Sequence, residues 1–249
     1  LPTATLARIS SMARTPVHRP APRISVNDLA QYMVSSDTAR VGILRRAKTP
    51  NIPPIIRYKD VRPVVNAFLS DNQRSVNLLV EAEEHFNQRA DDPSISALRQ
   101  DDARNSVEVL HAIQRMANSL TQFSFEPAPK RQAKLDLAGV EISVYADLIV
   151  TGTLRRAPHS GVAILRMTQA DGESEAAQTR RREMGLYVAT LARLHAEQNF
   201  DLSKPISNRF CMSIDVQHGE CFQAPESNSR RMNDLENACR FIVAMWDSV

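Results

Sequence analysis

Asp147 is the residue of this chain whose type and position best fit metal-dependent chemistry. It lies in VYADLIVTGTLRRAPHSGVAILRMT, residues 144–168, a stretch typical of a strand, a basic loop and a second strand. The second strand carries Arg166 and no carboxylate. Cleavage of a phosphodiester needs one or two Mg²⁺ ions on hard oxygen ligands, and one carboxylate alone makes a poor site for this ion. Metal chemistry here therefore requires a second acid from elsewhere in the chain.

Five arginines near this stretch could bind phosphates. Arg155 and Arg156 lie in the expected loop between the strands, and Arg180, Arg181 and Arg182 precede or open the helix expected after them. Guanidinium groups contact phosphates without any sequence motif, and each contact adds salt-dependent affinity. Positive side chains are also mildly unfavourable at a helix start. We expect a nucleic-acid surface close to the lone carboxylate or along its approach, and the alternative is that these arginines are only solvated.

Several other kinds of chemistry lack their motifs. No glycine-rich phosphate loop and no G-x-S-x-G is present, which disfavours nucleotide folds of the P-loop and Rossmann types and serine hydrolases. The three cysteines (Cys211, Cys221 and Cys239) form no C-x-x-C pair, so a zinc site is not expected. Their odd number, without a signal peptide, predicts a reducing compartment, namely the cytoplasm. No apolar run approaches the roughly 18 residues that span a bilayer, so we expect no membrane partner.

The charge of the chain is uneven. The first 60 residues hold ten Lys and Arg against three Asp, a formal charge of +7, and the rest of the chain carries −4. The first 27 residues have no acid and contain PVHRPAPR, which cannot stay helical. We expect a flexible basic arm over 1–24 and one globular domain over 25–249. Because Leu1 is not a natural start, either Met12 begins the protein or the numbering starts inside a longer frame.

The first half of the domain, about 25–130, is expected to be mostly helical. Ser25 or Asn27 can cap a helix, and apolar residues then recur at helical spacing in a series of segments. In the fourth segment we place Val76, Leu79, Val80 and Phe86 on the inward face. We expect five helices here. The first begins at residue 25–27 and the second at 36–37, and the other three cover 58–69, 75–90 and 105–120.

The second half, about 135–249, is expected to contain the sheet. LDLAGVEISVYADLIV alternates between apolar and polar residues from Val140 to Leu148 and predicts a strand, and GVAILRMT predicts its antiparallel neighbour, so we expect two adjacent strands within 140–168. We then expect a helix over 176–197, a hairpin over 209–225 with Gly219 at its turn, and a final helix from 232. The fold class is α+β, or α/β, with a small mixed sheet of two hairpins flanked by helices.

This order resembles the core of the PD-(D/E)XK nuclease superfamily, specifically its RecB-like branch. In that family the first strand ends in Pro-Asp, the next carries an acid, one residue and a lysine, and the following helix often carries Gln-x-x-x-Tyr. Here YAD keeps Asp147 with Ala146 for the proline, and EMGLYVATL keeps Tyr187 with Glu183 for the glutamine. The resemblance covers roughly 140–225, a restriction-endonuclease-like core. RISVNDLAQYM and ACRFIVAMW are also similar to segments of small bacterial proteins of this type.

The resemblance implies catalytic motifs that have degenerated. If Arg166 replaces the lysine, Ile164 stands at the acid position; if Met167 replaces it, Leu165 does. Asp147, Arg166 and Tyr187 are then vestiges of a catalytic set. In some members of the family a helix upstream donates an acid, so the resemblance offers Glu81 and Glu84 as further metal ligands with Asp147. The alternative for the two glutamates is a solvated acidic helix face.

Two functions follow as hypotheses. The first is a non-catalytic module on a degenerate nuclease-like fold, which binds a nucleic acid such as DNA, or a protein partner, and uses no cofactor. The second is an active Mg²⁺-dependent DNA nuclease whose second carboxylate comes from an unusual place. In either case the expected nucleic-acid contacts are Arg155, Arg156 and Arg180–Arg182.

Overall fold

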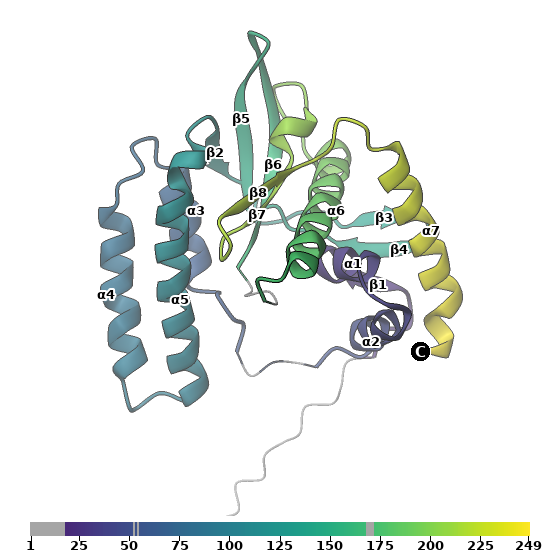
Figure 1. Cartoon of the computed structure of the whole chain (residues 1–249), viewed down its shortest axis with the longest axis horizontal. Coiled ribbons are helices and arrows are strands. Elements are labelled where there is room, and N and C mark those ends of the chain that lie inside the picture. The colour runs from purple at the N-terminus through teal and green to yellow at the C-terminus, as the bar shows by residue number, and fades with distance from the viewer. Residues whose placement is uncertain (1–17, 52, 54, 168–171) are drawn as a thin grey trace, which may run out of the picture.

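A mixed five-stranded sheet separates two groups of helices in the computed structural model, which describes residues 18–51, 53, 55–167 and 172–249 (Figure 1). The strand order is β2-β5-β6-β7-β8, and only the β6–β7 pair is parallel. The fold is therefore α+β. The strands are β2 (Ser124–Pro127), β5 (Leu148–Leu154), β6 (Ala157–Arg166), β7 (Met212–Asp215) and β8 (Glu220–Gln223).

A second, three-stranded sheet lies beside the first. Its strands are β1 (Arg23–Ser25), β3 (Leu135–Leu137) and β4 (Val140–Ser143). β4 is the central strand, parallel to β1 and antiparallel to β3. Ala138 and Gly139 join β3 to β4 with φ angles of +49° and +84°, a left-handed conformation that glycine adopts at little cost.

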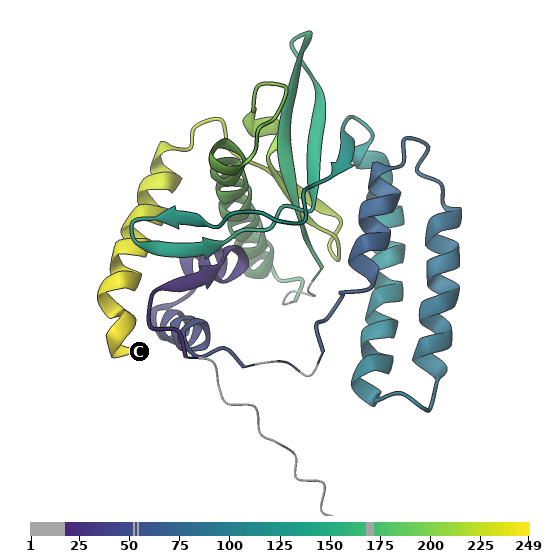
Figure 2. The same ribbon diagram turned by 180° about the vertical axis from the view of Figure 1, so that it is seen from behind.

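One face of the large sheet is covered by three helices. They are α3 (Val61–Ser70), α4 (Asn77–Asp91) and α5 (Ala97–Met116), and the short 3₁₀ helix η1 (Ala117–Leu120) follows. Phe68, Leu110 and Ile113 pack with Leu165 of β6 in the hydrophobic core on this side. Figure 2 shows α4 as the outermost helix, with α5 and α3 between it and the sheet.

The other face carries the remaining helices and the small sheet. The elements are α1 (Val26–Met33), α2 (Asp37–Lys48), α6 (Glu175–Asn199) and α7 (Ser229–Met245), with the 3₁₀ helix η3 (Trp246–Ser248). A further 3₁₀ helix, η2 (Asn208–Phe210), precedes β7, and its Phe210 packs in the core of the α3–α5 side. On the α6 side, Leu29 and Leu191 pack with Val162 and Ile164 of β6. Alternate residues of β6 therefore belong to two different cores, as the two-residue period of a strand requires.

The amphipathic helices expected from the sequence are confirmed, with different bounds. The side chain of Ser25 accepts a hydrogen bond from the backbone N–H of Asp28 and so caps α1. α5 begins eight residues earlier than expected, at Ala97. Val76 and Val80 were expected to face inward but are 43% and 47% exposed. The prediction is wrong for these two valines and is confirmed for Leu79 and Phe86, because the helix buries a face that excludes both valines.

The strand expected from Val140 through Leu148 is also wrong, because β4 ends at Ser143 and the rest of the segment leads into the other sheet. The chain turns back at Ala138–Gly139, and Leu148 begins β5 in the other sheet. Between the sheets, Gln132 holds the backbone of Ala146: its Nε2 donates to the carbonyl at 2.7 Å, and its Oε1 accepts from the N–H at 2.9 Å. The expected antiparallel neighbours do occur, as β5 and β6.

The basic loop expected between these strands is in fact a two-residue turn. Leu154 pairs with Ala157, so only Arg155 and Arg156 connect β5 to β6. The expected helix over 176–197 is confirmed as α6, which packs on β6 and β7, and the second expected hairpin is β7–β8 with Gly219 at φ +65°.

Part of the expected arm is folded. The backbone N–H of Arg19 donates to the carbonyl of Lys48 at 2.9 Å, and Arg23 begins β1. The rest of that expected arm, residues 1–17, lies outside the described residues. Among the described helices none is both long enough and apolar enough to cross a membrane.

Candidate functional site: an arginine cleft beside a committed carboxylate

Asp147 lies immediately before β5 with its side chain fully buried. Arg62 of α3 donates from Nη1 to Oδ1 at 2.7 Å, and the backbone N–H of Leu165 donates to Oδ2 at 2.7 Å. Burial raises the pKa of the Asp147 carboxyl, and the charge and hydrogen bond of Arg62 act in the opposite direction. Both carboxylate oxygens are therefore used to hold α3 and β6 against the start of β5.

No second acid accompanies Asp147 from the neighbouring strand. Ile164 and Leu165, at the two possible positions for that acid, are buried in the two cores. Among the described residues, no group of three or more His, Cys, Asp or Glu side chains is placed to hold a metal ion. Hard oxygen ligands for Mg²⁺ are therefore not gathered in the part of the chain that the structure describes.

The structure does not bring the upstream glutamates to this point. Glu81 and Glu84 are exposed on α4, which packs against α5 and α3 and is the outermost helix on its side of the sheet (Figure 1). Glu83 of the same helix pairs with His111 of α5 at 3.0 Å. These acids form a solvated helix face.

Next to Asp147 a cavity of about 700 Å³ opens between the end of the sheet, α6 and the α1–α2 corner. We call it the arginine cleft because four arginines line it, Arg62, Arg166, Arg180 and Arg181. Among the described residues that line it, Asp28 is the only acid. Polar side chains from α1 and from the turn into α2 complete the wall, among them Asn27, Gln31, Ser35 and Ser36.

Arg166 ends β6 and is only 8% exposed. Its Nη1 stands 3.6 Å from Oδ2 of Asp215, too far for a hydrogen bond, and its Nη2 donates to the sulfur of Met184 at 3.4 Å. Burial lowers the pKa of Arg166, and Asp215 and Glu220 act in the opposite direction. A guanidinium has five N–H donors, so this one is poorly matched by the weak acceptors around it.

The acids behind the cleft come from β7 and β8. Asp215 ends β7, and its Oδ1 accepts hydrogen bonds from the backbone N–H and the ring Nδ1 of His218 at 3.3 and 2.9 Å. Arg181 pairs with Glu220 at 3.7 Å and donates to the carbonyl of Gly172 at 2.8 Å. These acids neutralise much of the positive charge at the back of the cleft.

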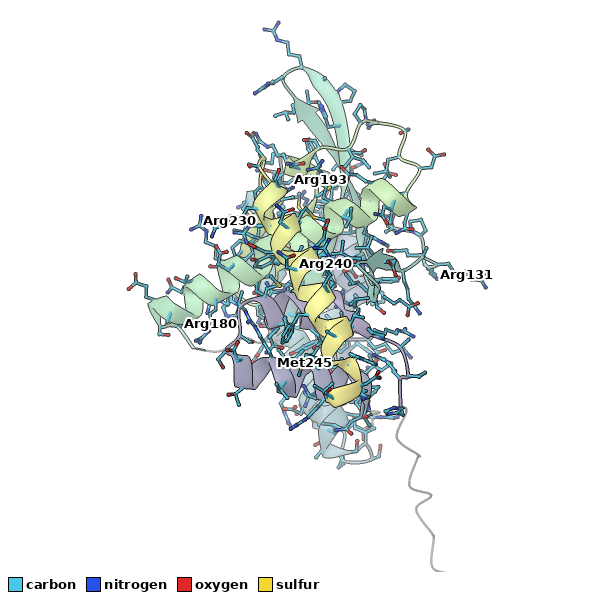
Figure 3. All side chains as sticks on the ribbon, turned by 90° about the vertical axis from the view of Figure 1, so that its right-hand side faces the viewer. Arg131, Arg180, Arg193, Arg230, Arg240 and Met245 are labelled. Carbon is cyan, nitrogen blue, oxygen red and sulfur yellow. The ribbon has the colours of Figure 1, made fainter. Side chains whose placement is uncertain are left out.

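The front of the cleft is different. Arg180 is exposed and makes no ion pair with any other described residue. Figure 3 shows it projecting from the molecule on the side opposite Arg131. Arg182 is also exposed, two residues further along α6. The arginines at the start of α6 thus comprise one buried member, Arg181, and two that are accessible to a ligand.

The other sequence-predicted residues lie elsewhere. The guanidinium carbon of Arg231 stands 4.8 Å from the centroid of the Tyr187 ring. Tyr187 lines a different cavity, beside α7. Tyr187 and Arg166 therefore do not face a common site. Arg155 and Arg156 were expected near Asp147 but lie at the opposite end of the β5–β6 hairpin, because β5 continues to Leu154 and β6 already begins at Ala157.

The sequence pattern did not reveal the partners of the site. Arg62 reaches Asp147 only because α3 docks across the end of the sheet, and no local pattern encodes that contact. For Asp215 the sequence did offer a signal, namely an acid at the end of an apolar strand. Because β7 runs parallel to β6, that acid lies beside Arg166. No protein-family model matches the chain, and no curated protein matches its sequence.

Proposed function

We propose that this protein is a non-catalytic module that binds the phosphate backbone of a nucleic acid at the arginine cleft. The observation that carries the proposal is the cleft itself: four guanidinium groups line it, and one of them, Arg180, makes no ion pair within the described chain. Phosphate oxygens are the acceptors that such groups bind best.

The same geometry favours binding without cleavage. Asp147 is committed to Arg62 and to the backbone of Leu165, and the acid position on the next strand is apolar. The order of β5, β6, α6 and β7, with β7 parallel to β6, supports the likeness to a nuclease-like core. On this proposal, a phosphate-binding end of that core is retained while the metal site is lost.

The protein is proposed to work in a reducing compartment such as the cytoplasm. Burial raises the pKa of each of the three thiols to about 12, so none of them is a reactive thiolate at neutral pH. All three are free thiols in the structure.

The test is a titration of a labelled duplex and a labelled single strand at several salt concentrations. Arg180 lines the cleft, and Arg182 is exposed beside it on α6. Replacing both by alanine should weaken binding and flatten the dependence of log K on log salt by about two units, roughly one per lost contact. Arg181 is left intact because it pairs with Glu220 behind the cleft. A matched control replaces Arg131 and Arg240, two exposed arginines of other surfaces, and should change the slope little.

Two outcomes would replace the proposal. If neither nucleic acid binds at low salt, the cleft serves a protein partner or another anion. If the protein cuts DNA with Mg²⁺ or Mn²⁺, and the Asp147→Asn variant stays folded but does not cut, the alternative of an active nuclease holds.

A further inference from the structure

We infer that the β5–β6 hairpin is a second nucleic-acid contact, and that it and the arginine cleft bind phosphates of one DNA duplex about one helical turn apart. This inference rests on the proposed function and adds to it the ligand, a duplex, and the length that must be bound.

The tip of the hairpin is a two-stranded ribbon, with Phe210 of η2 stacked on His159 at its base. β2 pairs with β5 only as far as Thr151, and β7 pairs with β6 only from Ala163. Beyond these limits the pairs from Gly152–His159 to Leu154–Ala157 have no further strand beside them among the described residues. Figures 1 and 2 show the ribbon projecting from the body of the molecule. A ribbon of two strands fits within a DNA groove.

The charge of the ribbon is of one sign. No Asp or Glu occurs from Leu148 to Thr168, and Arg155 and Arg156 are both exposed at the tip. The next segment to pack on the hairpin, η2, adds the exposed Arg209. In the arginine cleft, buried acids stand close behind the arginines, whereas the tip presents its charge without that compensation.

The turn is also built against its own backbone preference. Arg155 and Arg156 have φ angles of +51° and +67°, in the left-handed region. A two-residue turn of this type favours Asn-Gly, and a residue with a Cβ costs about 1–2 kcal/mol at each such position. Arginine at both positions is therefore a poor choice for the stability of the turn, and contact with an anionic partner accounts for it.

The spacing of the two basic sites identifies the ligand. Arg156 immediately precedes β6 and Arg166 ends it, ten residues further on, which is about 33 Å at the rise of a strand. One turn of B-DNA is about 34–36 Å long and brings phosphates back to the same side of the duplex. A single strand has no such fixed repeat. Two clusters at this distance thus suit a duplex of more than one turn.

The experiment measures affinity against duplex length, using GC-rich duplexes of about 8, 12 and 16 base pairs. Wild type should tighten by tenfold or more between about 8 and 16 base pairs, because only the longer duplex reaches both clusters. The variant Arg155→Asn/Arg156→Gly keeps the turn and removes both charges. The affinity of this variant should lack the tenfold increase and should rise only in proportion to the number of overlapping binding positions that a longer duplex offers.

The control variant Arg155→Lys/Arg156→Lys should keep the tenfold increase, since lysine also binds phosphate as a point charge. Thermal unfolding of the Asn-Gly variant checks the fold, and its midpoint should equal or exceed that of wild type. If the Asn-Gly variant tightens with length as wild type does, the hairpin is not a DNA contact. That result leaves the proposed function in place. If only Arg180→Ala/Arg182→Ala loses affinity for the duplex, the cleft alone is the binding site. If wild type binds no duplex at all, the proposed function itself fails.

Discussion

The carboxylate of Asp147 is sealed from solvent, and its charge depends on one guanidinium that is itself about one-third exposed. Removing one partner of a buried ion pair is more costly than removing both, because the remaining charge stays buried without compensation. The pair therefore has a structural role, which joins α3 to the sheet, and its removal is expected to affect stability before it affects binding.

Arg62→Ala should lower the free energy of unfolding at pH 7 by about 3–5 kcal/mol. Without Arg62 the pKa of the buried Asp147 rises further above its unfolded value, so the folded state takes up a proton first as the pH falls. Part of the lost stability should then return between neutral pH and about pH 4. Urea titrations across this range measure it.

The double variant Arg62→Ala/Asp147→Asn provides the matched comparison. It has no carboxylate at this position, so its stability should lack the recovery at low pH. If Arg62→Ala alone costs no more than about 0.5 kcal/mol, as an exposed substitution does, then Asp147 does not depend on Arg62.

At the scale of elements, the helices were predictable and the assignment of strands to sheets was not. A helical stripe such as Val109, Ile113 and Met116 identifies a helix from its own sequence. The alternation over 135–150 continues through Val144 and Leu148 although the chain leaves one sheet for the other. Only the phase change at Ala138–Gly139 marked the turn, since Leu137 and Val140 both point inward.

The candidate site divides in the same way. Arg180 and Arg182 at the start of α6 follow from the sequence, because the helix and its first residues could be located. The distance of Arg155 and Arg156 from Asp147 could not be predicted, because it depends on how far the strands extend. Apolar and basic residues near a turn fit a ribbon as well as a loop.

Packing between α6 and β8 gives a test at this scale. A Cβ at Gly185 would overlap the ring of Phe222. Alanine normally favours a helix by about 1 kcal/mol over glycine, but Gly185→Ala should lower stability by about 1–3 kcal/mol, because the overlap must push α6 from the sheet. The measurement is the free energy of unfolding in urea.

Gly42 of α2 is the control, because a Cβ there meets only the end of the Arg46 side chain at 3.6 Å. Gly42→Ala should be neutral or stabilising by up to about 1 kcal/mol. In Gly185→Ala, truncating Phe222 to alanine as well should cost less than the sum of the two single changes. Additive effects would show that the two residues do not meet.

At the scale of the whole molecule, two hydrophobic cores share one sheet. In the core on the α6 side, a buried histidine links α6 to the segment between the two sheets. His195 of α6 is fully buried; its Nε2 lies 3.0 Å from Oε1 of Gln132, and Asn199 lies 3.0 Å from its Nδ1. Gln132 in turn holds Ala146, next to Asp147. The amide of Asn199 donates to Nδ1, so the neutral ring carries its proton on Nε2.

Global stability should therefore fall on mild acidification. Burial lowers the pKa of His195 to about 4 from 6.5, so the unfolded chain binds a proton in this window and the folded chain does not. The contribution of neutral His195 to the free energy of unfolding is complete above pH 6.5 and is lost as the pH falls toward 4. The loss amounts to about 2 kcal/mol by pH 5.

Chemical unfolding of wild type and His195→Gln between pH 8 and pH 5 measures this effect. The variant should be less stable at pH 8 but should change less with pH. Equal pH dependence in the two proteins would mean that His195 does not titrate differently on folding.

The parallel pairing of β1 with β4 has a consequence for synthesis on the ribosome. Arg23 meets Glu141, a partner made 118 residues later, which takes about 6–24 s at typical rates of translation. During that interval Ile24 and Leu29, both buried in the finished protein, have no sheet to cover them. The α4–α5 pair, whose contacts are local in sequence, can form first. The segment that contains β1 and α1 is thus completed late although it is made before the other described elements, and its apolar residues remain available to chaperones until β4 emerges.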